Sequence, residues 1–162
     1  RASFEGRAPA AAPEQAQPRS ESAPKPHLDT TLKVRDAMTR NVRTVDRNER
    51  LSVADEIMKL GSFRHVVVLD EREAVAGVIS SFHGALAWSL GLGRSAHEKS
   101  LAAYPVKQVM NTEVVTIAPD ADLRQAAAIM AEKKVGCLPV VDGTKLVGIL
   151  TEADFLALLT GA

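Results

Sequence analysis

The chain repeats itself after residue 32, and this internal duplication restricts the possible folds more than any other feature of the sequence. The segment Val-Arg-Asp-Ala-Met at 34–38 returns as Val-Lys-Gln-Val-Met at 106–110, and ten of the 37 positions from 34 to 70 carry the same residue 72 positions later. With one residue fewer in the second copy, residues 77–80 then align with 148–151. We therefore expect both copies to adopt one fold.

Each copy is predicted to contain an amphipathic helix, because apolar residues recur at helical spacing. A short extended piece, residues 43–45 or 115–117, precedes the helix. Asp122, followed three positions later by Gln125, predicts a capping box at the start of the second helix. The apolar positions are Leu51, Ala54, Ile57 and Met58 in the first copy, and Leu123, Ala126, Ile129 and Met130 in the second.

Two strands and a further helix follow in each copy. A β-branched run at 66–69 or 138–141 ends at Asp70 or Asp142, and a second extended run follows at 74–80 or 145–151. Asp142 with the glycine after it predicts a tight hairpin turn. The order β-α-β-β-α in each half predicts an α+β fold, α/β-like, with a small and mainly buried sheet.

Composition divides the chain into a tail and two repeats. Five of the eight prolines lie before residue 27, among alanine and polar residues, so residues 1–30 are predicted to be a disordered Pro/Ala-rich tail. An arm that docks on a partner is the alternative. The remaining boundaries are predicted at 31–84 for the first repeat, 85–105 for a helical linker and 106–162 for the second repeat.

Charge and aromatic content argue against a nucleic-acid partner. Lys and Arg number 20, Asp and Glu number 20, and aromatic residues make up 4% of the chain. A nucleic-acid-binding protein usually has a basic excess or aromatic residues for stacking on bases. No apolar run approaches the roughly 20 residues that cross a bilayer, so no membrane partner is expected.

The location is expected to be cytoplasmic. The single cysteine excludes an intramolecular disulfide and a Cys-rich zinc module, and it fits a reducing compartment. The start of the chain has no apolar segment typical of a signal peptide. The first residue is Arg1 rather than methionine, which leaves residues upstream of it open.

The sequence predicts no catalytic or metal-binding residues, and hence no enzyme. Residues 91–96 have the letters of a dinucleotide glycine fingerprint, but they follow a helical stretch rather than a strand. Phosphate-binding Walker and Gly-x-Ser-x-Gly motifs are absent. The histidines lack the spacing of metal ligands. Convergence of His65, His83 and Cys137 on a zinc ion in the folded chain is the alternative.

The second copy ends in a motif whose side chains could contact a ligand, Gly-Ile-Leu-Thr-Glu-Ala-Asp at residues 148–154. Thr151 can cap the helix that begins there, and Asp154 stands in its first turn, near unpaired backbone N–H groups. A plain capping box explains this pattern. A carboxylate at this place also suits the two hydroxyls of a ribose, and the helix amides suit a phosphate.

In this order and repeated, these motifs resemble a tandem pair of CBS domains, the nucleotide-sensing repeats named after cystathionine β-synthase. The resemblance covers residues 34–159. It implies two β-α-β-β-α units that pair about a pseudo-twofold axis and leave two clefts between them. Such pairs commonly bind AMP, ADP, ATP or S-adenosylmethionine, need no other cofactor, form homodimers and regulate an attached or separate effector protein.

The resemblance assigns nucleotide-binding positions mainly to one cleft. Asp154 falls on the carboxylate that binds the ribose, Thr151 on the hydroxyl that supports the ligand, and Ile149 on the lining of the adenine slot. The three residues at 63–65 fall where family members contact the base and the phosphates. An arginine there offers a fork of donors to phosphate. These three residues are Phe63, Arg64 and His65.

The second cleft is predicted to be weaker or tuned to another ligand. His83 stands where the aspartate belongs; alternatively, Phe82 aligns with Phe155 and the helix start has lost three residues, the acid among them. The ribose carboxylate is missing in either alignment, and a neutral imidazole cannot accept two hydroxyl protons as a carboxylate does. Ser80, Val135 and Cys137 are its other expected members, and Lys133 or Lys134 just upstream could supply the missing positive charge. The alternative for the whole chain is an interaction or dimerisation module that binds no nucleotide.

Overall fold

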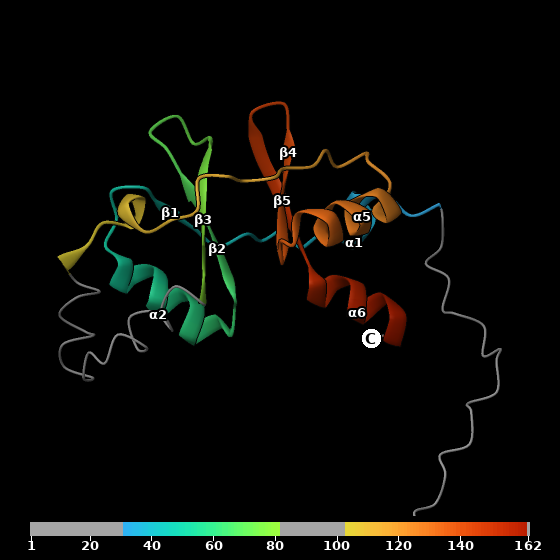
Figure 1. Ribbon diagram of the computed structural model, residues 1–162, viewed down its shortest axis with the longest axis horizontal. Coiled ribbons are helices and arrows are strands. Elements are labelled where there is room, and N and C mark those ends of the chain that lie inside the picture. Colours follow the sequence, from blue (N-terminus) through green and yellow to red (C-terminus); the bar gives the residue numbers. More distant parts are fainter. Residues whose placement is uncertain (1–30, 82–102, 162) are drawn as a thin grey trace, which may run out of the picture.

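The computed structural model describes residues 31–81 and 103–161 (Figure 1). The predicted tail, most of the predicted linker and His83 lie outside the described residues. The described part has the predicted α+β fold, with one small sheet from each copy. Figure 1 shows the two sheets side by side at the centre of the molecule.

The first copy forms a three-stranded sheet in the order β1-β2-β3. Strand β1 (Thr44–Asp46) pairs in parallel with β2 (His65–Leu69), which pairs antiparallel with β3 (Val75–Ser80). Helix α2 (Leu51–Gly61) connects β1 to β2. Its buried residues include three of the four predicted apolar positions, Leu51, Ala54 and Met58, and Ile57 is partly buried against the same core.

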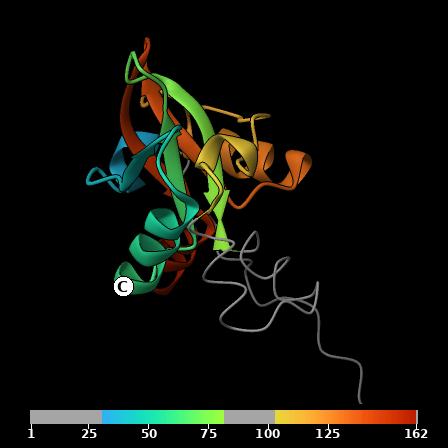
Figure 2. The ribbon, with the colours of Figure 1, turned by 90° about the vertical axis from the view of Figure 1, so that its left-hand side faces the viewer.

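The second copy repeats this arrangement with one strand fewer. Helix α5 (Leu123–Lys133) leads to the antiparallel pair β4 (Cys137–Asp142) and β5 (Lys145–Thr151), and helix α6 (Glu152–Thr160) follows. The predicted hairpin turn is confirmed, and Gly143 adopts a φ of 64°, a conformation that favours glycine. In both views the β2–β3 and β4–β5 turns lie at one end of the molecule and α2 and α6 at the other (Figures 1 and 2).

The extended piece predicted before α5 does not form a strand, unlike its counterpart β1. In the first copy the Val67 N–H donates to the Arg43 carbonyl at 3.3 Å. The residue at the place of Val67 in the second copy is Pro139, which has no N–H to donate. Pairing is therefore reduced to a bridge between Ile117 and Val140.

The capping box predicted for α5 is wrong. Asp122 does precede the helix as its N-cap residue, but its side chain makes no hydrogen bond to the helix backbone. Its carboxylate instead accepts a hydrogen bond from the Lys33 Nζ at 2.5 Å. The charged partner from the start of the described chain competes successfully with the uncharged backbone donors.

Each copy contributes its first residues to the core of the other copy. Helix α1 (Val34–Ala37) and the short helix η1 (Val106–Gln108) are the first elements of the two repeats. Val34 and Met38 are buried in the core around α5, β4 and β5, whereas Val106 is buried in the core around α2, β2 and β3. The predicted repeat boundaries stay predictions, but each of the two cores contains residues from both copies.

In each sheet a glycine lies against the methionine from the first segment of the other copy. A Cβ atom added to Gly148 would lie 2.5 Å from the Met38 Sδ, and one added to Gly77 would lie 2.5 Å from the Met110 Sδ. Only a residue without a side chain leaves room for the sulfur there. These two contacts explain why the methionine and the glycine recur together in the sequence.

Candidate functional site

Two cavities lie at the junction of the two copies, and the repeat relates them to each other. The large cavity has a volume of about 410 Å³ and the small cavity about 190 Å³. Many of their lining residues occupy equivalent positions in the two copies. These pairs include Thr39 and Asn111, Val42 and Val114, Arg43 and Val115, Phe63 and Val135, and His65 and Cys137.

The large cavity brings together all six residues predicted for the main cleft. Three come from the segment that joins α2 to β2 and from the first residue of β2, and three from the end of β5 and the start of α6. Their roles toward a ligand stay predictions. The six are Phe63, Arg64, His65, Ile149, Thr151 and Asp154.

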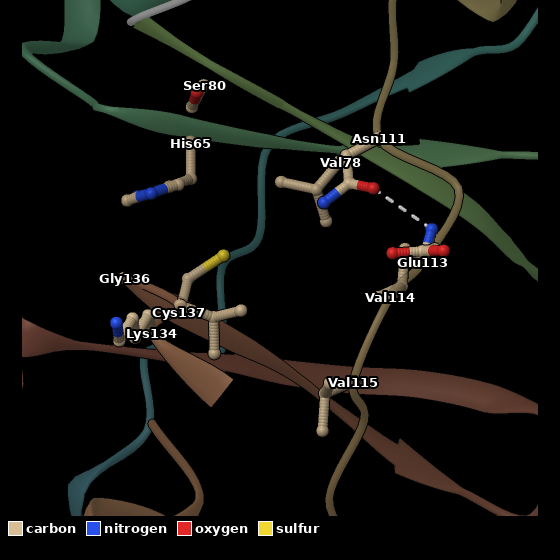
Figure 3. A pocket seen from close by; sticks show the side chains of 11 residues that line it. His65, Val78, Ser80, Asn111, Glu113, Val114, Val115, Lys134, Gly136 and Cys137 are labelled. Atoms are coloured by element: carbon tan, nitrogen blue, oxygen red, sulfur yellow. Dashed lines mark hydrogen bonds between the residues drawn. The ribbon is translucent and has the colours of Figure 1, made fainter. Parts of the chain in front are cut away.

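The small cavity contains the described residues predicted for the second cleft, namely Ser80, Val135 and Cys137. Figure 3 shows Ser80 and Cys137 among its lining. Lys134 also lines it, as one of the two predicted substitutes for the missing positive charge. Lys133 is not among the lining residues, and its Nζ lies 3.7 Å from the carboxylate of Glu132.

Asp154 is held at the start of α6 by its own helix cap. Its Oδ2 accepts hydrogen bonds from the Thr151 backbone N–H at 2.7 Å and from the Thr151 Oγ1 at 2.9 Å. Its Oδ1 has a single long contact, 3.4 Å from the Thr39 Oγ1. A carboxylate has about four lone-pair sites, so this group can cap the helix and still accept hydroxyl donors from the cavity.

The end of α2 places Phe63 and Arg64 at the large cavity. Ser62 leaves the helix in the left-handed conformation with a φ of 54°, and the Phe63 N–H donates to the Met58 carbonyl at 3.0 Å. This helix ending turns the chain sharply toward β2. The Phe63 side chain, 39% exposed, lies over Gly61, where an added Cβ would come 2.0 Å from the ring.

Charges of both signs face the large cavity, with Arg43 and Arg64 opposite Glu152 and Asp154 in sign. Burial lowers the pKa of His65, Glu152 acts in the opposite direction, and Arg64 lowers the pKa further. The imidazole is therefore neutral at pH 7, so the positive charge of this cavity comes from the two arginines.

Burial raises the pKa of the Cys137 thiol to about 12. A protonated thiol is a poor nucleophile and a poor metal ligand. Among the described residues, no group of three His, Cys, Asp or Glu side chains could hold a metal ion. His83, the third member of the alternative zinc site, lies outside them.

The sequence did not single out Thr39, Arg43 or Glu152, which also line the large cavity. Thr39 and Arg43 follow the first methionine motif and reach this cavity because that segment packs on the other copy: Thr39 forms an antiparallel bridge with Ile149 of β5. The polar residue that follows the methionine in both copies, Thr39 or Asn111, was the available signal. Glu152 lies within the predicted helix start, where the sequence motif assigns a role only to Thr151 and Asp154.

No helix in the described ranges has both the length and the apolar character needed to span a membrane.

Comparison with known proteins gives a consistent family match. A protein-family model described as "CBS domain" matches residues 34–83 and 106–161. The CBS domain-containing protein YhcV of Bacillus subtilis is 32% identical over 121 residues, which cover 75% of this chain and 81% of YhcV.

Solved structures show the same fold. AcuB from Vibrio cholerae aligns with a TM-score of 0.70 and 34% identity over 80% of this chain and 92% of that one. CBSX2, solved in complex with AMP, aligns with a TM-score of 0.64 and 25% identity over 80% of this chain and 96% of its own. The CBS domain pair of MJ0100, in complex with 5′-methylthioadenosine and S-adenosyl-L-methionine, aligns with a TM-score of 0.68 and 24% identity over 80% and 97%.

Several relatives are much longer proteins. The chain spans 33% of the length of the uncharacterised protein MJ1404 of Methanocaldococcus jannaschii, at 28% identity over 83% of this chain. It spans 22% of a homoserine O-acetyltransferase of Methanococcus vannielii, at 30% identity over 70% of this chain.

Proposed function

The chain belongs to the CBS domain family, and on that premise we propose that it is a regulatory module that binds an adenine nucleotide or another adenosyl ligand in the large cavity. The observation that supports this most is the convergence of six predicted ligand residues on one cavity. Cavities that hold small ligands typically measure about 300–1,000 Å³. The large cavity, at about 410 Å³, falls within this range.

In the proposed complex the adenosyl group contacts both copies. Asp154 accepts the ribose hydroxyls, Ile149 and Phe63 line the base, and Arg64 donates to a phosphate. A ligand held in this way bridges the first and second repeats. It shifts their relative packing by as much as its affinity for the two arrangements differs, and this shift is the signal to an effector protein.

Structural relatives support the class of ligand. CBSX2 was solved with AMP, and the MJ0100 domain pair with two adenosyl compounds. The chain is proposed to act by binding rather than by catalysis, since the buried and protonated Cys137 is a poor nucleophile. The acetyltransferase activity belongs to a relative of which this chain spans 22%, and it is not carried over.

The proposed module works as a homodimer. Helix α6 has no buried residue, and three of its leucines are well exposed: Leu156 by 62%, Leu158 by 38% and Leu159 by 47%. A contiguous apolar face of this kind is usually covered by a partner, here a second copy. Light scattering at micromolar concentration should give twice the monomer mass, and a monomer mass would contradict the proposal.

A thermal-shift panel tests the ligand proposal. AMP, ADP, ATP, S-adenosylmethionine and NAD are compared with the apo protein, and a bound ligand at about 100 times its Kd should add roughly 2.7 kcal/mol of stability. Stabilisation by at least one adenosyl compound is expected. No shift with any of them would favour the alternative, an interaction or dimerisation module without a nucleotide.

A further inference from the structure

One side chain forms the partition between the two cavities. Among the described residues, His65 and Gly136 line both the large and the small cavity. The imidazole lies directly against Gly136: an added Cβ on this glycine would be 3.1 Å from the His65 Nε2 and 3.2 Å from the Cε1. Because Gly136 has no side chain of its own, the ring of His65 is the side-chain part of this wall.

The wall is not repeated by the pseudo-symmetry of the fold. Cys137 occupies the position of His65 in the second copy, and Arg64 occupies the position of Gly136. Figure 3 shows His65 and Cys137, which both line the small cavity, on strands of different sheets. A thiol is much shorter than an imidazole, so only the first copy supplies a side chain long enough to divide the two spaces.

A ligand in the large cavity would act directly on this ring. Arg64, the expected phosphate donor, is the neighbour of His65 in the chain, and both line the large cavity. The Glu152 carboxylate, at the start of α6, lies near the same wall: its Oε2 is 4.0 Å from the Cβ that would be added to Gly136. A phosphate placed beside Arg64 accepts a hydrogen bond from an imidazole N–H and competes with the contact between the ring and Gly136.

We propose that His65 is a movable wall through which a phosphate-bearing ligand in the large cavity changes the accessibility of the small cavity. The inference rests on the proposed function and names the residue that connects the two clefts. By thermodynamic linkage, a ligand in the small cavity changes the affinity of the large cavity by the same factor.

Cys137 is a native reporter for this coupling. It is the only cysteine of the chain, it lines the small cavity, and it is 8% exposed. The experiment measures its rate of alkylation by iodoacetamide at pH 8.5 in the full chain, followed by mass spectrometry. Calorimetry on each variant sets the AMP concentration at saturation.

In the wild type, saturating AMP should raise the alkylation rate about fivefold or more, a typical lower bound for coupled sites. In His65→Ala the two cavities merge, so alkylation should be fast without AMP and should no longer respond to it. Leu60→Ala is the control, because Leu60 is 82% exposed and lines neither the large nor the small cavity, so its loss should leave both the ligand-free rate and the AMP response unchanged.

Two results would overturn the inference while leaving the proposed function intact. These are a ligand-free rate in His65→Ala equal to that of the wild type, or an AMP response of equal size in both proteins. His65→Gln, which keeps a polar side chain, should retain part of the response and replaces His65→Ala if that variant fails to fold. No AMP binding by calorimetry would overturn the proposed function and the coupling together.

Discussion

The large and small cavities have the same backbone frame but different side chains. Thr39 and Ile149 exchange two backbone hydrogen bonds of 2.9 Å beside the large cavity, and Asn111 and Val78 exchange two of 3.0 Å beside the small one. Helices α2 and α5 also end alike, with a φ of 54° at both Ser62 and Lys134. The symmetry of the duplication is therefore a property of the frame and not of the chemistry.

The reason lies in what each position must do. Core positions have to fill a closed volume, so they are identical or similar in the two copies, whereas cavity positions face open space and can differ at little cost in stability. At the cavity positions, arginine in the first copy is replaced by valine or glycine in the second, and phenylalanine is replaced by valine. The pairs are Arg43 and Val115, Arg64 and Gly136, and Phe63 and Val135.

The largest effect is expected from Asp154→Ala. Loss of a charged acceptor for two ribose hydroxyls should weaken adenosyl binding by about 1.5–3 kcal/mol. This corresponds to a roughly 10- to 150-fold higher Kd, measured by calorimetry with AMP. His83→Ala, the same place in the other copy, should change the Kd far less.

Asp154 also accepts two hydrogen bonds from Thr151, so a stability control is needed. Asp154→Asn keeps an oxygen for the cap but has only one acceptor oxygen and no charge. It should melt near the wild type and still bind weakly. Wild-type affinity in both variants, or two equal sites per chain, would place the ligand elsewhere.

The fold was predictable from the sequence because its signals are local or repeated. The stripe of Leu51, Ala54 and Met58 has the period of a helix with one buried face, and the duplication supplied a second, independent copy of the pattern. The turn at Gly143 follows from the need for a positive φ.

The exchange of the first segments was not predictable, because nothing local says which core Met38 enters. Its partner Gly148 lies 110 residues further along the chain, in the second copy. Gly77, in the same copy as Met38, is an equivalent glycine that Met38 could contact instead. The same exchange brings Thr39 to Asp154, so this part of the site was missed with it. The failed capping box has a similar cause, since Lys33 and Asp122 are distant in sequence.

The second expected effect tests whether equivalent backbone positions of the two copies contribute equally to folding stability. Gly77→Ala and Gly148→Ala each force a methionine sulfur from its seat and should destabilise the fold by about 1–3 kcal/mol. The two losses should be equal within the error of chemical denaturation. A loss confined to one variant would show that the symmetry of the frame does not extend to its energetics.

A smaller effect should separate the ends of α2 and α5. Gly61→Ala displaces the Phe63 ring from the helix end and should weaken AMP binding by roughly 1 kcal/mol, the lower range of base–aromatic stacking. Lys133→Ala alters the equivalent position beside Val135 and should leave the Kd unchanged. In a Phe63→Ala background, Gly61→Ala should also have no effect on the Kd, and a persistent effect would mean that the glycine acts by another route.

The symmetry-related pair His65 and Cys137 should give opposite pH limits to stability. Burial lowers the pKa of His65 from its ordinary 6.5, so the unfolded chain binds more protons just below this value and stability is lost as the pH falls from 6.5.

Burial raises the pKa of Cys137 from 9.0 to about 12, so its contribution to stability is complete below pH 9 and is lost as the pH rises beyond it. Urea midpoints between pH 5.5 and 10.5 should therefore flatten on the acid side in His65→Gln and on the alkaline side in Cys137→Ala. Unchanged acid slopes in His65→Gln would mean that the imidazole is as well solvated in the folded chain as in the unfolded one, which is incompatible with a ring packed between two cavities.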